Sequence, residues 1–191
     1  MELGHTQRRW PLAQAARAIA NGGVIAYPTE AVYGLGCDPN NAAAVLHLLE
    51  LKQRRIEKGL ILIAANLEQL LPYIETPSAE QLQRIGNSWP GPTTWLIPKR
   101  PDTPVWLSGK HNTIAVRITA HPLAKALCLA CNSALISTSA NRHNQIPART
   151  SLKVRQQFAN KLDYILSGST NRQAQPSAIH DLRTGRIIRP S

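Results

Sequence analysis

Short apolar runs recur along the chain, and each is bounded by Gly, Pro, Asn or Ser. Such runs, rich in Val, Ile and Leu, are typical of β-strands. They occupy residues 23–27, 59–65, 93–97, 113–119, 134–138, 164–167, 177–182 and 186–190. The pattern therefore predicts a β-sheet assembled from strands spread over most of the chain.

Segments between these runs carry apolar residues at three- and four-residue spacing, which predicts amphipathic helices. They are residues 11–22, 41–54, 66–74, 78–85, 121–131 and 151–162. Strands that alternate with helices predict an α/β fold, and we expect one domain over residues 1–191 with a mixed sheet and flanking helices. The strands after residue 164 follow one another too closely for crossover helices, so antiparallel pairing is expected there.

The chain carries a strong excess of positive charge. Its 191 residues include 22 Lys and Arg against 11 Asp and Glu, a net charge of +11, and 43% are apolar. That apolar content is enough for a globular core. The positive field attracts nucleotides, RNA or other phosphates. The motifs GxxxxGK[ST], GxGxxG, GxSxG and HExxH are absent, so a phosphate site must be built in another way.

Targeting signals and cysteine chemistry contribute little. No apolar run approaches the roughly 20 residues that cross a bilayer, and no apolar segment follows the N-terminal charges. We therefore expect a cytoplasmic protein without membrane contact. Cys128 and Cys131 have the CxxC spacing of redox and zinc sites, but they lie in an apolar, helix-like segment without a second ligand pair, which favours buried core residues.

Charged residues are concentrated just before the apolar run at 59–65. They are Lys52, Arg54, Arg55, Glu57 and Lys58. Cations near a helix C-terminus are favoured by the helix dipole, so a solvated face accounts for part of this charge. It does not account for the density, and guanidinium and ammonium groups together suit a polyphosphate. Composition alone leaves both interpretations open.

The stretch YPTEAVYGLGCD follows the first strand run. There we expect a turn in which Thr29 offers a hydroxyl, while Gly34 and Gly36 let the backbone approach a ligand. An ordinary strand-to-helix loop is the alternative.

Polar residues also mark two later strand runs. Ser137, Ser139 and Asn141 collect at the carboxyl end of one strand, where open α/β sheets bind ligands. Alternatively, Ser139 or Asn141 caps a following helix. In the run at 113–119, Thr113 and Arg117 point to one face. An arginine there is rarely buried without an anionic partner.

Five motifs occur together in a known order. They are YPTEAVYGLGCDP, LKQR with KGLILIA, WPGPTTW, IAVRIT with HPL, and STSAN, and they span nearly the whole chain. In this order and spacing the chain resembles the YrdC family, and in length it is similar to the family's short bacterial members. The family's KxR and SxN signatures correspond to residues 52–54 and 139–141.

The resemblance implies a twisted sheet with a positively charged concave cavity. It also implies synthesis of threonylcarbamoyl-AMP and pyrophosphate from L-threonine, bicarbonate or CO2, and ATP, with Mg²⁺ carried by the nucleotide and no dedicated metal site. A transfer complex of TsaB, TsaD and TsaE type would then place the threonylcarbamoyl group on the tRNA adenosine beside the anticodon. The implied protein is a monomer.

The resemblance also implies roles for individual residues. The catalytic set is Lys52, Arg54, Ser139 and Asn141; ATP binding adds Lys58, Thr113 and Arg189; and threonine binding uses Thr29, Arg117, Ser137 and Ser177. Ala31 stands where many members have a second threonine, so other groups must hold the amino acid there. The loop at 142–148 also departs from the family pattern. A labile adenylate would favour closure of residues 142–150 over it, but the sequence does not reveal whether this loop closes.

A function of another class fits the same charge. A non-catalytic binder of structured RNA, such as tRNA or a ribosomal RNA precursor, would use the basic cavity for phosphate contacts alone. It would tolerate the loss of Ser139 or Arg117, whereas adenylation would not. A third possibility, an unrelated ATP hydrolase, would release phosphate without threonine.

Overall fold

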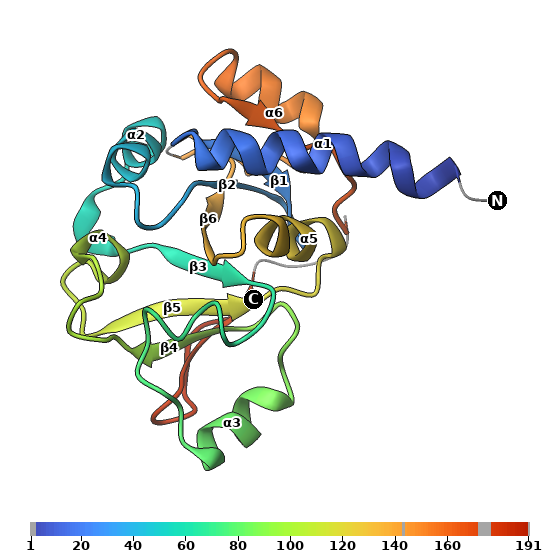
Figure 1. Ribbon diagram of the computed structural model, residues 1–191. Coiled ribbons are helices and arrows are strands. Elements are labelled where there is room, and N and C mark those ends of the chain that lie inside the picture. Colours follow the sequence, from blue (N-terminus) through green and yellow to red (C-terminus); the bar gives the residue numbers. More distant parts are fainter. Residues whose placement is uncertain (1–2, 143, 172–176, 191) are drawn as a thin grey trace.

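A mixed β-sheet forms the centre of the molecule, and helices cover parts of it (Figure 1). The computed structural model describes residues 3–142, 144–171 and 177–190, with side chains from Trp10 onward. In the described residues the strand order is β7-β1-β2-β6-β3-β5-β4-β8-β9. The expected α/β fold with a mixed sheet is confirmed.

Most elements lie where the hydrophobic pattern predicts them, but the strand at 33–36, the 3-10 helix at 56–58 and the short helix at 105–108 were not predicted. The strands are β1 (Ile25–Pro28), β2 (Tyr33–Gly36), β3 (Ile61–Ala64), β4 (Thr94–Pro98), β5 (Thr113–Ile118), β6 (Leu135–Ser139), β7 (Tyr164–Ile165), β8 (Ile179–Asp181) and β9 (Ile187–Arg189). The helices are α1 (Leu3–Ala20), α2 (Ala42–Lys52), the 3-10 helix η1 (Ile56–Lys58), α3 (Ala79–Gly86), α4 (Val105–Ser108), α5 (Pro122–Ala130) and α6 (Ser151–Phe158). No described helix is long and apolar enough to cross a membrane.

The predicted turn after β1 contains a strand. β2 pairs antiparallel with β1, with Ile25 opposite Gly36, and with β6 on its other side. Its two glycines have low β-propensity, which is why the pattern did not indicate a strand. Gly36 is required because a Cβ there would clash with the Ile136 carbonyl oxygen.

The predicted helix at 66–74 is wrong. The segment forms consecutive turns, with bonds from Leu70 N to Leu67 O at 2.8 Å and from Tyr73 N to Leu70 O at 2.9 Å. Pro72 has no N–H group and cannot continue a helical ladder. The periodic apolar residues are nevertheless buried, since Leu70 is 0% and Ile74 is 1% exposed.

The predicted pairing of the late strands is correct for only one pair. β8 and β9 are antiparallel, but β7 pairs in parallel with β1, and β8 pairs in parallel with β4. β7 and β8 therefore lie near opposite edges of the sheet. The chain crosses between them without a helix in the described residues, so a short sequence separation did not indicate adjacent strands.

The core lies on both faces of the sheet, and one face is only partly covered. On that face Ile63 and Leu135 pack in a cluster with Ala124 and Leu127 of α5, and α5 packs against α1. Two residues away along β3 and β6, Ile61 and Ser137 share the same face. They line a cavity instead. The functional surface therefore begins where the helix layer stops.

The prediction that the CxxC cysteines are buried core residues is confirmed for Cys128, whereas Cys131 packs at the edge of the core. Cys128 is fully buried and Cys131 is half-buried. Burial, and after it the charge of Asp38, raises the pKa of Cys131 to about 11, so its thiol is a poor nucleophile at neutral pH.

Candidate functional site

A cavity of about 510 Å³ opens on the uncovered face of the sheet. Its lining combines the β1–β2 turn, the η1–β3 turn, strands β5 and β6, and the C-terminal strand β9, which are far apart in the sequence. The structure brings together nine of the eleven residues singled out above, namely Thr29, Arg54, Lys58, Thr113, Arg117, Ser137, Ser139, Ser177 and Arg189. The other two, Lys52 and Asn141, lie behind the lining.

The cavity is not the crevice of a parallel sheet. The carboxyl end of β6 lies between β2 and β3, and β6 is antiparallel to both. Ser137 and Ser139 therefore line the face of the sheet next to the starting end of β3. The rule for open parallel sheets indicated the right residues but the wrong geometry.

The lining carries more positive than negative charge. Arg54, Lys58, Arg117 and Arg189 line it, and among the described lining residues Glu30 is the only acid. Burial, and then the charge of Arg189, lowers the pKa of Arg54. Burial, and then the charge of Arg117, lowers the pKa of Arg189. The guanidinium groups repel one another, and a bound anion would relieve that repulsion.

A glycine turn holds Arg54 over the cavity. Helix α2 ends with Gln53 in the left-handed region at a φ of 48°. Arg54 then donates from Nη2 to the carbonyl oxygen of Gly59 at 2.8 Å. Gly59 itself has a φ of +61°, and a Cβ there would lie 2.8 Å from Leu107 O. Only glycine fits this turn without strain.

Lys52 and Asn141 form a network behind Ser139. Lys52 is 7% exposed, and its Nζ donates to Ser139 O at 2.6 Å, Asn141 O at 2.6 Å and Asn141 Oδ1 at 2.8 Å. Ser139 Oγ also donates to Asn141 Oδ1, at 2.6 Å. The following helix, α6, is capped by Thr150 and not by Ser139 or Asn141. The capping alternative for Ser139 and Asn141 is therefore wrong.

Two opposing effects set the pKa of Lys52. Burial, and then the charge of Arg54, lowers the pKa of Lys52 to about 8. Its three oxygen acceptors use all three ammonium protons and favour the charged form. A nearby anion would move the balance further toward the ammonium.

The β1–β2 turn supplies another part of the lining. Thr29 Oγ1 donates to Val32 O at 2.7 Å and closes the turn. Ala31 contributes only a buried methyl group. Gly34 leaves room for the neighbouring strand, because a Cβ there would lie 3.1 Å from Ser137 Oγ.

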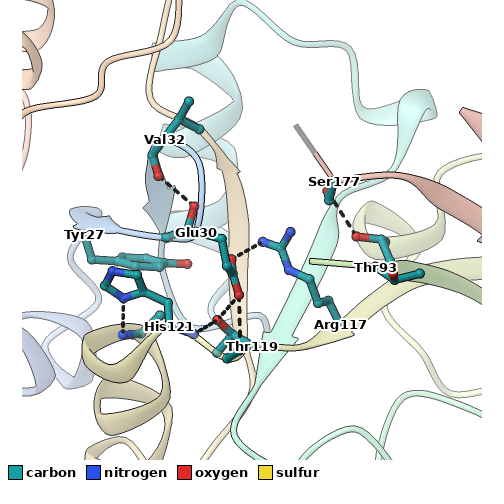
Figure 2. Close-up of polar contacts among 12 residues, drawn as sticks. Tyr27, Glu30, Val32, Thr93, Arg117, Thr119, His121 and Ser177 are labelled. Carbon is teal, nitrogen blue, oxygen red and sulfur yellow. Dashed lines mark hydrogen bonds and ion pairs between the residues drawn. The ribbon is translucent and has the colours of Figure 1, made fainter. Parts of the chain in front are cut away.

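Sequence reasoning missed Glu30. Figure 2 shows its carboxylate between Arg117 and Thr119. Oε1 accepts hydrogen bonds from Thr119 Oγ1 at 2.7 Å and from Ala120 N at 3.1 Å, and Oε2 lies 3.6 Å from Arg117 Nη2. The available signal was that a buried arginine is rarely unpaired. That signal led us to expect a ligand anion beside Arg117. In the structure a protein carboxylate also faces it.

Glu30 is ionised at neutral pH. Burial alone would raise its pKa, but the charge of Arg117 and the hydrogen bonds from Thr119 and backbone N–H groups together lower it. The lining thus contains two groups of residues, which we call the cationic end (Arg54, Lys58, Ser139 and Arg189) and the paired end (Glu30 and Arg117). The two ends adjoin, because after burial the charge of Arg117 also lowers the pKa of Arg189.

The described residues do not build a metal centre. No group of three or more His, Cys, Asp or Glu side chains among them could hold a metal ion. Glu30 is already paired with Arg117. A protein cage for Mg²⁺ would require several oxygen ligands, and the described cavity lining does not fit that need.

A family model named Sua5_yciO_yrdC, with the description "Telomere recombination", matches residues 17–191. The chain belongs to the Sua5/YciO/YrdC family. Proteins named threonylcarbamoyl-AMP synthase are similar to it over nearly their whole length. The one from Nitrosococcus oceani is 54% identical over 94% of this chain and 97% of its own, and one from Pseudomonas aeruginosa is 51% identical over 93% and 95%.

Solved structures of the Sua5/YciO/YrdC family share the fold. Sua5 from P. abyssi, in a crystal structure with L-threonine, has a TM-score of 0.85 at 32% identity. The match covers 91% of this chain but only 51% of that longer one. YciO from E. coli has a TM-score of 0.81 at 24% identity and supports the fold alone.

Proposed function

We propose that this chain is a threonylcarbamoyl-AMP synthase. It would convert L-threonine, bicarbonate and ATP into threonylcarbamoyl-AMP, pyrophosphate and water. Relatives that carry this name match the chain over nearly their full length. The structural observation that carries the proposal is a single cavity in which a cationic end adjoins a buried pair of opposite charges.

The cationic end suits a triphosphate. Arg54 and Arg189 are held by carbonyl groups, and Lys58 is exposed on the same lining. Negative charge moves onto the leaving pyrophosphate during adenylation, so fixed cations there lower the barrier. Thr113 and Ser139 offer hydroxyl groups to the nucleotide. Magnesium would arrive bound to the phosphates rather than to a protein cage.

The paired end suits an amino acid. Arg117 would take the carboxylate of threonine, with Thr29, Ser137 and Ser177 as hydroxyl partners from the same lining. The free amine attacks bicarbonate to give a carbamate and water. A carbamate oxygen then attacks the α-phosphorus, and the bond to pyrophosphate breaks. Carbamates are weak nucleophiles, so alignment of the two substrates contributes strongly.

Lys52 and Asn141 act from behind the lining in this proposal. Their bonds fix the end of β6 and so place Ser139. Lys52 adds positive charge close to the cationic end without leaving its acceptors. Both are positioning residues in the free enzyme.

The chemistry of the product indicates the partners that we propose. Threonylcarbamoyl-AMP is an activated acyl donor, so a transfer complex of TsaB, TsaD and TsaE type would pass the group to tRNA. The enzyme would act as a monomer in the cytoplasm.

Pyrophosphate release from purified protein tests the function. We expect release, with a product of the mass of threonylcarbamoyl-AMP, only when threonine, bicarbonate and ATP are all present. Release that is indifferent to threonine would identify a hydrolase and contradict the proposal. RNA binding without any pyrophosphate release would favour the structured-RNA alternative, which the charge of +11 alone would explain.

A further inference from the structure

The contact between Glu30 and Arg117 is incomplete. Their closest atoms, Oε2 and Nη2, are 3.6 Å apart, which is too long for a hydrogen bond. Glu30 Oε2 and Arg117 Nε are both buried and have no hydrogen-bond partner among the described residues. Buried polar atoms are normally paired, so an acceptor and a donor remain available on one wall of the cavity.

We propose that Glu30 and Arg117 form a clamp for an amino-acid zwitterion, in which Glu30 Oε2 accepts from the substrate nitrogen while Arg117 binds the carboxylate. The inference rests on the proposed function and deepens it, because it gives Glu30 a role in selecting the amino acid. The two free groups match the two ends of the ligand. A carboxylate accepts from the Arg117 guanidinium, and an ammonium group donates to Oε2.

The neighbouring hydrogen bonds fix which oxygen is free. Thr119 and Ala120 both donate to Oε1, which holds the carboxylate in one orientation and leaves Oε2 toward Arg117. Oε2 is covered in the free protein, so it becomes reachable when Arg117 turns toward the substrate carboxylate. The two ends of the ligand therefore bind cooperatively.

The clamp also directs the next step. The bound ammonium group releases one proton to solvent before its nitrogen attacks bicarbonate. The nitrogen still keeps an N–H group as amine, carbamate and product, so its bond to Glu30 can persist throughout. The new carbamate oxygens are negative and are repelled by Glu30. They turn away from Glu30 toward the cationic end of Arg54 and Arg189, where the α-phosphorus would lie. Glu30 is thus a positioning residue as well as a specificity residue.

A purely structural role for Glu30 predicts different behaviour. If the carboxylate only oriented Arg117, its loss would weaken every ligand that binds Arg117 through a carboxylate. If it binds the nitrogen, its loss weakens only ligands that carry one. (R)-3-hydroxybutanoate is threonine without the amino group, so it separates the two roles.

The variant Glu30→Gln provides the test. Its amide oxygen can accept from Thr119 and Ala120, which turns the NH₂ group toward Arg117 and replaces the acceptor by a donor. We expect calorimetric affinity for L-threonine to fall about 10- to 100-fold, with affinities for (R)-3-hydroxybutanoate and ATP within about twofold of the unmodified enzyme. Glu75→Gln, at an exposed glutamate, is the matched control and should change nothing.

Each result has one meaning. Equal weakening of threonine and (R)-3-hydroxybutanoate, or no change for threonine, would overturn the clamp. If Glu30→Gln does not fold, Thr119→Val tests the same point, because it loosens the carboxylate without removing it. It should then weaken threonine selectively by about three- to tenfold. Suppose that the variants weaken threonine binding selectively while the unmodified enzyme releases no threonine-dependent pyrophosphate. In that case the proposed reaction fails and the clamp stands.

Discussion

The two ends of the cavity differ in their electrostatics: one gathers like charges and the other pairs opposite charges. At the cationic end, burial and then the charge of Arg189 lower the pKa of Arg54. At the paired end, burial would raise the pKa of Glu30, but the charge of Arg117 lowers it; the same charge also lowers the pKa of Arg189 at the adjoining end. The first end is strained until a polyanion arrives, whereas the second is almost neutral and suits a zwitterion. Changes at one end should therefore affect mainly the substrate that binds there.

Removal of Arg54 should produce the largest difference between the effects on the two substrates. Arg54→Ala deletes a carbonyl-anchored cation of the strained end. We expect the rate of pyrophosphate formation to fall by about 100- to 1000-fold, while threonine affinity changes less than about threefold. Steady-state kinetics and calorimetry measure the two quantities.

The neighbouring exposed arginine provides the control. Arg55→Ala removes the same charge one residue away and should keep the rate within about twofold. Equal losses in the two variants would mean that the net field of the surface matters, and not the placed guanidinium of Arg54.

Proton uptake by Lys52 on ligand binding should distinguish the cationic end from the paired end. The pKa of Lys52 is about 8 in the free protein, and a triphosphate at the cationic end would raise it. The complex then holds more protons than the free protein at and somewhat above pH 8, so ATP binding takes up protons there and weakens as the pH rises further. Threonine bound as a zwitterion also takes up protons near this pH, but through its own amino group, so that uptake should not change with Lys52→Met.

Calorimetry in two buffers of different ionisation enthalpy measures the uptake. We expect a fraction of a proton per ATP near pH 8.5, and none with Lys52→Met. Uptake that survives this substitution would assign the proton to the nucleotide or to another residue.

The sequence predicted the elements well because their apolar spacing reflects burial directly. It did not predict strand β2, since Gly34 and Gly36 serve close packing and give no β signal. It also did not predict the partner of β7, because pairing across the sheet depends on tertiary contacts such as the one from Val24 N to Asp163.

Within the candidate site, motif positions indicated the lining but not the depth of each residue. Lys52 and Arg54 are two residues apart, yet Arg54 lines the cavity and Lys52 points behind Ser139. The left-handed conformation of Gln53 between them turns the chain after α2. Glu30 was missed because a single carboxylate in a turn gives no pattern until Arg117 and Thr119 are brought beside it.

The loop whose closure the sequence leaves open is tied at several points. Asn141 Nδ2 donates to Arg142 O and Gln145 O, both at 2.9 Å, and Ala148 N donates to Ala140 O at 2.9 Å. Between these ties, Ile146 is 83% exposed. Its carbonyl accepts from Gln157 Nε2 of α6 at 3.0 Å. Any closure must therefore be confined to the tip, since the base is part of the sheet network that holds the cationic end.

Loosening this tip gives the smallest expected effect. Gln157→Ala removes one exposed hydrogen bond, which contributes about 1 kcal/mol or less. We expect hydrogen exchange of peptides covering residues 144–150 to speed up by at most about fivefold, with activity within about twofold, while Gln156→Ala on the exposed side of α6 changes neither. With ATP and threonine bound, a closing tip would lose this difference, because ligand contacts would replace the lost bond. Identical exchange with and without the ligands would mean that the loop does not close, and that alignment depends on the two rigid ends of the cavity alone.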